Sequence, residues 1–263
     1  MQRLWDTQGT PWASFAFFGA KPKKVATAVA KLPYKRRLDV GITDKINIKH
    51  KHKKDTTMIT VIDYGMGNLH SVKNALDFLG IENKVTGELD EIKSASALIL
   101  PGVGAFPDAM KTLEEKGIAD IIKEKCEGGT PLLGICLGMQ LLVDSSEEVA
   151  FTKGLGLIKG KCIKIADTGL KIPHMGWNDL TVDIPECPIL KYTENGNYVY
   201  FVHSFRIDLE NEKENLASHT MYGEKIPAVI TNGKNVFGAQ FHPEKSEKIG
   251  LDMLKAFAEF CNA

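Results

Sequence analysis

The sequence has no apolar run long enough to cross a lipid bilayer. Its longest apolar stretch, Leu132 to Val143, is interrupted by Gly134, Gly138 and Gln140, whereas a transmembrane helix needs roughly 20 consecutive apolar residues. We therefore expect no membrane segment. With 43% hydrophobic and 25% charged residues, the composition is typical of a soluble globular protein.

Paired cysteines are also missing. None of the five cysteines belongs to a Cys-x-x-Cys pair: Cys126, Cys136, Cys162, Cys187 and Cys261. Zinc sites and disulfide frameworks show closely spaced or regularly paired cysteines, so we predict neither. We expect most of these cysteines to be small buried residues in a reducing cytoplasm, and nothing implies a metal or an organic cofactor.

The formal net charge is zero, which indicates no polyanionic partner. The charge is unevenly distributed along the chain, because residues 1–57 contain 13 Lys/Arg against 4 Asp/Glu. This segment lacks an apolar period, and three interpretations compete: a basic arm for nucleic acid, a targeting peptide, or an extension that is disordered or added by an upstream start codon. We favour the last, and expect no nucleic-acid partner.

From Met58 onward, short apolar strands alternate with amphipathic helices. Strands are predicted over 58–63, 97–100 and 130–135, with helices after residue 69 and over 106–127. This alternation is typical of an α/β fold with a parallel sheet covered on both faces. After about residue 155 we predict strands over 157–165, 198–207, 228–230 and 236–241, a turn at Asn232-Gly233, and a last helix carrying Ile249 and Phe257. We interpret 58–263 as one domain.

A glycine loop, Gly65-Met66-Gly67, follows the first strand. Phosphate binding is one interpretation. The motif lacks a third glycine and an acidic ribose ligand, so we favour a structural or partner-facing turn.

The segment from Gly134 to Gln140 contains a candidate cysteine nucleophile. It leaves an apolar strand and enters a helix with the spacing Gly-x-Cys-x-Gly, which is typical of a nucleophile elbow. A helix N-terminus favours the thiolate of Cys136, and the backbone N–H of Leu137 would face a developing oxyanion. The alternative is a buried structural cysteine between two packing glycines.

A cysteine nucleophile needs a base with an orienting group. Phe241-His242-Pro243-Glu244 supplies both, because Pro243 fixes the backbone between the imidazole and the carboxylate. We predict that Glu244 accepts from one ring nitrogen while the other faces Cys136. His174 and His203 are rival bases, but neither has an acidic residue two positions on.

Together, Gly-Ile-Cys-Leu-Gly-Met-Gln and Phe-His-Pro-Glu resemble the triad (class I) glutamine amidotransferases. The resemblance implies a flavodoxin-like three-layer α/β fold with a largely parallel central sheet. It also implies that Cys136 attacks the side-chain amide of glutamine, that His242 is base and then acid, and that Glu244 orients it.

Three further segments resemble the glutaminase subunits of imidazole glycerol phosphate synthases: 101–106, 173–178 and 200–205. The resemblance covers essentially all of 58–263. It implies a heterodimer with a cyclase subunit, which uses the ammonia to make imidazole glycerol phosphate and AICAR in histidine biosynthesis.

The same resemblance assigns further roles. Val103 joins Leu137 in the oxyanion hole, after its peptide turns inward when the cyclase binds its ligand; glycines on both sides ease that turn. Glutamine contacts are implied for Gly102, Gly104, Gln140, Glu148, Ser204 and Phe205. Relatives often have Tyr at the position of Phe205. Contacts with the cyclase are implied for Met175, Trp177, Asn178, Tyr200 and Lys245; the alternative is an ordinary core hairpin.

Three other functions compete with this interpretation. The partner could instead make anthranilate, carbamoyl phosphate or guanylate, but those relatives lack the 173–178 segment. A stand-alone cysteine hydrolase would work without any partner. A non-catalytic binding subunit would not need Cys136, His242 and Glu244 together.

Overall fold

A mixed sheet of eight strands forms the centre of the protein, and the computed structural model describes it within residues 57–263. The strand order is β2-β1-β3-β4-β14-β13-β12-β9. The first five strands are parallel to one another, and the last three continue the sheet in antiparallel fashion. Their bounds are β1 Ile59–Ile62, β2 Asn83–Thr86, β3 Ala97–Gly102, β4 Leu132–Cys136, β9 Thr181–Val182, β12 Leu216–Tyr222, β13 Glu224–Thr231 and β14 Val236–Ala239.

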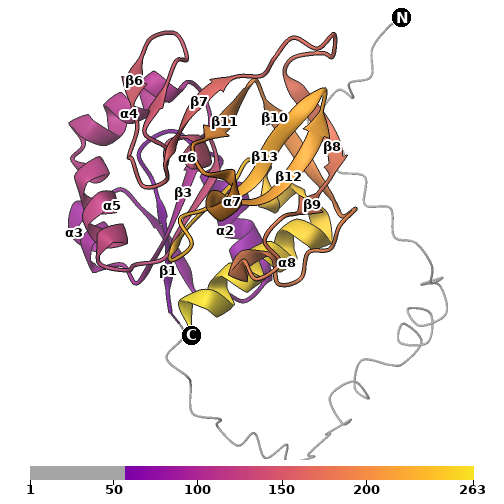
Figure 1. Ribbon diagram of the computed structural model, residues 1–263. Helices are drawn as coiled ribbons and strands as arrows, with labels where there is room; N and C mark the ends of the chain where they lie inside the picture. Colours follow the sequence, from indigo (N-terminus) through magenta and orange to yellow (C-terminus); the bar gives the residue numbers. More distant parts are fainter. Residues whose placement is uncertain (1–56) are drawn as a thin grey trace, which may run out of the picture. The chain divides into compact units, whose positions relative to one another are not determined.

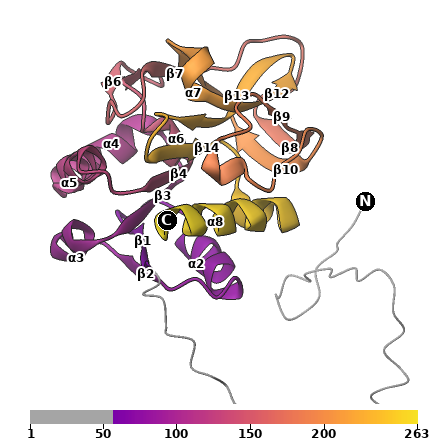
Figure 2. The same cartoon turned by 60° about the horizontal axis from the view of Figure 1, so that its bottom comes forward.

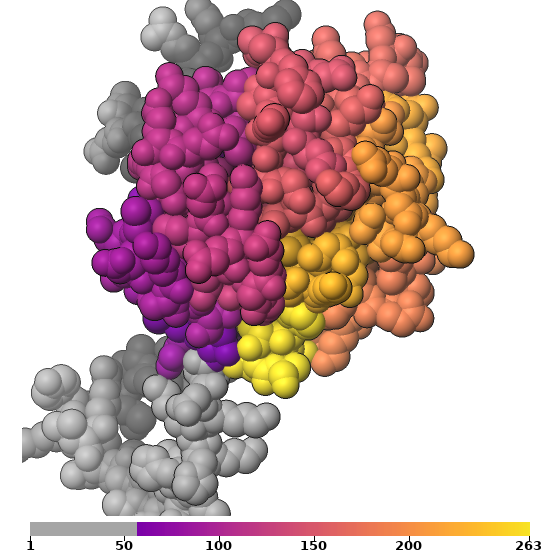
Figure 3. Space-filling view, turned by 60° about the vertical axis from the view of Figure 1, so that its left-hand side comes forward, coloured from indigo at the N-terminus to yellow at the C-terminus, as the bar shows by residue number. Residues whose placement is uncertain are grey.

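Helices cover both faces of the parallel part (Figures 1 and 2). Because successive side chains of a strand point to opposite faces, Leu98 and Leu100 of β3 pack with one set of helices, and Ala97 and Ile99 with the other. The first set is α3 (Leu89–Ser94), α4 (Phe106–Glu115) and α5 (Ile118–Glu127), which lie in the purple and magenta part of the face seen in Figure 3. The second is α2 (Leu69–Phe78) and α8 (Glu247–Cys261). The expected three-layer α/β architecture is confirmed.

Two smaller sheets complete the fold. One has the order β11-β7-β5-β6, and the other is a ribbon of β10 and β8. Their strands are β5 Ser145–Ser146, β6 Thr152–Lys153, β7 Gly160–Lys164, β8 His174–Asp179, β10 Tyr198–His203 and β11 Phe205–Leu209. Short helical turns link the rest: α6 Leu137–Gln140, η2 Pro188–Leu190, α7 Glu212–Asn215 and η3 Pro243–Lys245.

Two strand predictions were wrong in their bounds. The single strand expected over 198–207 is two strands in different sheets. Up to His203 the chain pairs with β8, as strand β10; from Phe205 it pairs with β7, as strand β11. The strand expected from Leu157 begins at Gly160, since the amides of Leu157 and Ile158 both donate to Leu142 O and turn the chain back on itself. The sequence also did not predict β2, a short strand whose side chains are mostly half-buried.

The described chain begins at Thr57, whose amide and hydroxyl donate to Asn262 Oδ1 and Cys261 O at the end of α8. The prediction for residues 1–57 falls, apart from Thr57, outside the described residues. Among residues 57–263, no helix is long and apolar enough to span a membrane.

Candidate active site

Cys136 occupies a sharp turn between β4 and the one-turn helix α6. Its backbone has φ 56° and ψ −110°, a left-handed φ that is unfavourable for a residue with a side chain. The flanking glycines make the turn possible: a Cβ on Gly138 would lie 1.8 Å from Leu100 O, and one on Gly134 would lie 2.6 Å from Gly138 O. The predicted elbow is present. Since α6 has only four residues, its helix dipole contributes less than a long helix would.

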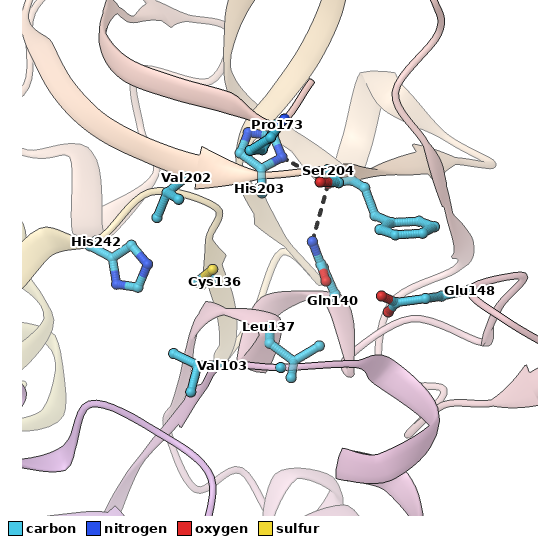
Figure 4. A pocket seen from close by; sticks show the side chains of 12 residues that line it. Val103, Cys136, Leu137, Gln140, Glu148, Pro173, Val202, His203, Ser204 and His242 are labelled. Atoms are coloured by element: carbon cyan, nitrogen blue, oxygen red, sulfur yellow. Dashed lines mark hydrogen bonds between the residues drawn. The ribbon is translucent and has the colours of Figure 1, made fainter. Parts of the chain in front are cut away.

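The side chain of Cys136 faces a cavity of about 390 Å³. Figure 4 shows the sulfur between His242 on one side and Gln140 on the other. The residues around the cavity are Val103, Gly104, Cys136, Leu137, Gln140, Glu148, Pro173, Val202, His203, Ser204, Phe205 and His242. Nine of the eleven residues predicted for catalysis, the oxyanion hole and glutamine binding therefore line one cavity, from segments spread over 140 positions of the chain.

His242, which lines the cavity, is paired with the buried Glu244. Nδ1 of His242 lies 2.8 Å from Oε1 of Glu244, and the side chains are only 4% and 1% exposed. The backbone is held too, because His242 N donates to Tyr200 O and Ser246 Oγ donates to His242 O. Burial lowers the pKa of His242, but the hydrogen bonds to Cys136 and Glu244 and their negative charges more than offset it and raise the pKa to about 9.

His242 is placed beside Cys136 as a proton donor. At neutral pH an imidazole with a pKa near 9 is protonated. The arrangement can therefore present a nucleophile and a proton donor to the same bound group.

The rival histidines are poor bases. His203 lines the cavity, but burial, together with the nearby His174 and His242, lowers its pKa to about 3. Its Nε2 lies 3.1 Å from Nδ1 of His174. His174 is fully buried at the start of β8, stacked between Phe201 and Tyr222.

Two of the predicted glutamine contacts have other partners in this structure. Glu148 accepts the backbone N–H of Phe106 at 2.8 Å and so caps the first turn of α4. Gly102 is buried in β3 opposite Cys136 and does not border the cavity. A Cβ there would lie 2.8 Å from the Tyr64 hydroxyl and 2.9 Å from Gly138 N, so this glycine serves close packing behind the elbow.

Met175, Trp177 and Asn178, which were expected to contact the cyclase, belong to the strand β8. It pairs with β10 so that Trp177 lies opposite Tyr200, and their rings meet edge to face at 6.1 Å. Met175 and Trp177 point to the same face and are 61% and 43% exposed. Asn178 donates to Met221 O, and Lys245 is exposed beside the His242–Glu244 pair. The segment is therefore a ribbon whose outer face is not covered by any other part of residues 57–263.

Gln240 was missed by the sequence analysis. It is fully buried, and its Nε2 lies 3.9 Å from the Cys136 sulfur. The available signal was a polar amide directly before Phe241-His242, at the end of an apolar strand. No cluster of His, Cys, Asp or Glu within residues 57–263 has the arrangement of a metal site.

Comparisons with known proteins agree with this geometry. The family model for glutamine amidotransferase class-I matches residues 60–259. The chain is 53% identical over 202 residues to the imidazole glycerol phosphate synthase subunit HisH of Caldanaerobacter subterraneus subsp. tengcongensis, covering 77% of this chain and 98% of the relative. It is 49% identical to the HisH subunit of Listeria innocua, covering 77% and 95%.

Solved structures agree in fold. PurLQS from Thermotoga maritima superposes with a TM-score of 0.63 at 24% identity, covering 78% of this chain and 99% of that one. A crystal structure of a glutamine amidotransferase gives 0.62 at 22%, with the same coverage. The chain belongs to the class I glutamine amidotransferase family, in the group of imidazole glycerol phosphate synthase subunits HisH.

Proposed function

We propose that this chain hydrolyses glutamine to glutamate and ammonia through a thioester on Cys136, and delivers the ammonia to a cyclase subunit in histidine biosynthesis. The observation that carries the proposal is the cavity in which the strained Cys136 meets the buried His242–Glu244 pair. The relatives named HisH support the pathway and the kind of partner.

The chemistry has two halves. The Cys136 thiolate attacks the side-chain carbonyl carbon of glutamine, and the backbone N–H groups of Leu137 and Val103 stabilise the oxyanion. The His242 imidazolium gives its proton to the leaving nitrogen, so that ammonia departs and the thioester remains. Neutral His242 then takes a proton from water as the water attacks the thioester, which releases glutamate. Glu244 holds the ring orientation throughout.

The cavity offers groups of the right kind for the amino-acid end of the substrate. The carboxylate of Glu148 faces the cavity (Figure 4) and suits the α-ammonium group of glutamine. Gln140 uses its NH2 group within the protein, toward Phe205 O and Gln240 Oε1, so its carbonyl oxygen is the group left for the substrate. Gly104 and Ser204 offer backbone contacts, while Phe205 lacks a hydroxyl and contributes packing.

We assign the cyclase interface to the outer face of the β8–β10 ribbon. Exposed Met175 and Trp177 offer apolar anchors, and buried aromatic side chains often dominate binding energy at interfaces. Tyr200 lies opposite Trp177 on the same face, whereas the side chain of Asn178 points to the other face and donates to Met221 O. Lys245 would stand where ammonia leaves the site. Docking next to the cavity gives the cyclase a means of acting on Val103, whose peptide would turn its N–H inward in the complex. The proposal is a heterodimer in the cytoplasm, with 58–263 as the working domain and 1–57 as an extension not needed for activity.

The test is glutamate release by the full chain, alone and with the cyclase subunit plus its ribonucleotide ligand, with Cys136→Ala as the blank. We expect almost no glutamate release by the chain alone and a strong increase in the complex. Equal rates in both conditions would indicate a stand-alone cysteine glutaminase and would exclude activation by the cyclase. A cyclase for another pathway, added as a second control, should give no rise.

A further inference from the structure

The amide of Gln240 lies against the predicted nucleophile. Gln240 follows β14 directly, its side chain is fully buried, and its backbone N–H is fixed by a bond to Ala228 O. Nε2 lies 3.9 Å from the sulfur of Cys136, within reach of an N–H···S contact. The roles given above to Cys136, His242 and Glu244 do not use this group.

The orientation of that amide is fixed by its neighbours. Phe205 O can only accept, and it lies 3.1 Å from Nε2 of Gln140. Nδ1 of His203 lies 2.8 Å from the same oxygen. The NH2 group of Gln140 must therefore face Phe205 O, and its second hydrogen is directed to Oε1 of Gln240 at 3.1 Å. With its oxygen held there, Gln240 can turn only its NH2 group toward Cys136.

We propose that Gln240 is a positioning residue that donates an N–H to the Cys136 sulfur and stabilises the thiolate for the glutaminase reaction. The role of Gln240 in turnover rests on the proposed function. The contact between Gln240 and Cys136 does not, because it can be tested on the cysteine without any glutamine hydrolysis. A hydrogen bond from a neutral donor to a buried anion is stronger than one between neutral groups. It also lasts over the whole working pH range, because an amide does not titrate.

Several titratable groups also surround this sulfur. His242 lies on the β14 side and is the charged partner. Tyr64, at the end of β1, interacts with Cys136 but keeps its proton, because burial raises its pKa. Cys162 on β7 has a pKa raised to about 12 by burial, and Glu148 is the carboxylate across the cavity. Among the described residues, His242 and Gln240 are the side chains recorded in hydrogen bonds to this sulfur, so removing the Gln240 donor should be measurable.

The experiment measures the pH dependence of Cys136 alkylation in the full chain. Iodoacetamide is used at a range of pH values, and the Cys136 peptide is quantified by mass spectrometry. One variant is Gln240→Glu, which keeps the size and the acceptor for Gln140 and, in its ionised form, loses the donor and adds a negative charge. Gln240→Met removes the donor without adding charge. Asn235→Asp is the matched control, since Asn235 is a buried amide that donates to Cys126 O and Thr130 O rather than to Cys136.

In Gln240→Met we expect the alkylation midpoint to rise by about one pH unit, which is a tenfold change in thiolate stability, and in Gln240→Glu by more. At pH 7, kcat in the cyclase complex should fall about tenfold, with KM within about twofold. Asn235→Asp should keep the wild-type midpoint even if it melts at a lower temperature.

Unchanged midpoints in both Gln240 variants would overturn the inference and leave Gln240 a structural residue, whatever the melting temperatures. Should wild type release no glutamate with the cyclase, the proposed function fails, yet shifted midpoints would still establish the Gln240 contact. Should wild type be active while the midpoints stay in place, the inference alone fails.

Discussion

Nδ1 of His242 and Oε1 of Glu244 lie 2.8 Å apart although both side chains are almost completely buried. The second oxygen of this carboxylate, Oε2, is buried and has no hydrogen-bond partner among the described residues. A buried carboxylate with one unsatisfied oxygen is costly unless a positive charge stands beside it. The pair therefore favours the imidazolium form of His242, which is the form that would protonate the leaving nitrogen of glutamine in the proposed reaction.

Replacing Glu244 with glutamine should lower kcat by about a hundredfold, a typical share for acid–base catalysis. The amide can still accept from Nδ1 but carries no charge, so the pKa of His242 should fall from about 9. The alkaline limb of the rate profile of the cyclase complex should move to lower pH by the same amount. Glu259→Gln is the control, since Glu259 pairs with Lys191 at the surface of α8. An unmoved alkaline limb would show that Glu244 does not set the pKa of His242.

Replacing Val103 with proline should lower kcat in the complex by about 10² to 10³, because proline has no N–H to offer the oxyanion. Val103→Ala keeps the N–H, and the valine side chain is 44% exposed, so this variant should stay within about threefold of wild type, as surface changes usually do. Steady-state glutamate release of both variants in the cyclase complex is the measurement. Equal losses in the two variants would point to the side chain and against the peptide.

Truncating Trp177 to alanine should weaken cyclase binding by at least about 2 kcal/mol, roughly thirtyfold in Kd, as expected for an aromatic anchor. The side chain is 43% exposed in the monomer, so the melting temperature should change little. Calorimetric titration with the cyclase is the measurement. Phe78→Ala is the matched control: Phe78 is 78% exposed at the end of α2. If both variants bind alike, the β8–β10 face is not the interface.

The buried His203 should make the protein acid-sensitive. Its folded pKa is about 3, well below the 6.5 of a free histidine, so below pH 6.5 the unfolded chain takes up a proton that the folded protein does not. Stability is therefore full above pH 6.5 and falls as the pH drops toward 3, by about 2 kcal/mol at pH 5. His174 has a pKa lowered by burial and adds in the same direction.

Urea midpoints at pH 7 and pH 5 test this expectation. His203→Gln should be less stable than wild type at pH 7 but should lose less stability between the two pH values. His70→Gln, a change at an exposed histidine of α2, should follow the wild-type dependence. An equal loss in His203→Gln and wild type would mean that acid destabilisation comes from other groups.

Local patterns determined much of the parallel half of the fold. The apolar strands before Gly102 and Cys136 appear where their composition predicts them, since a strand buried on both faces needs consecutive apolar residues. The strand that the sequence did not predict was β2: three of its four residues are polar, as suits a strand at the edge of the sheet.

The second half was less predictable. A run such as 198–207 has continuous β-forming character, and only the positions of β7 and β8 decide that it changes sheets at Ser204. Pairing partners are chosen by tertiary packing, which a local pattern does not contain.

By itself, the sequence was enough to propose which groups react. Cys136 stands between two glycines that only a tight turn requires, and His242 and Glu244 are held together by the proline between them; these are local relations within a few residues. The tertiary structure alone decided that Gln240 turns its NH2 group toward the sulfur, that His174 and His203 are a buried pair unfit to act as a base, and that Met175 and Trp177 face outward. Hydrogen-bond direction, burial and exposure depend on groups far apart along the chain, and they become defined only when the sheet and the ribbon bring those groups together.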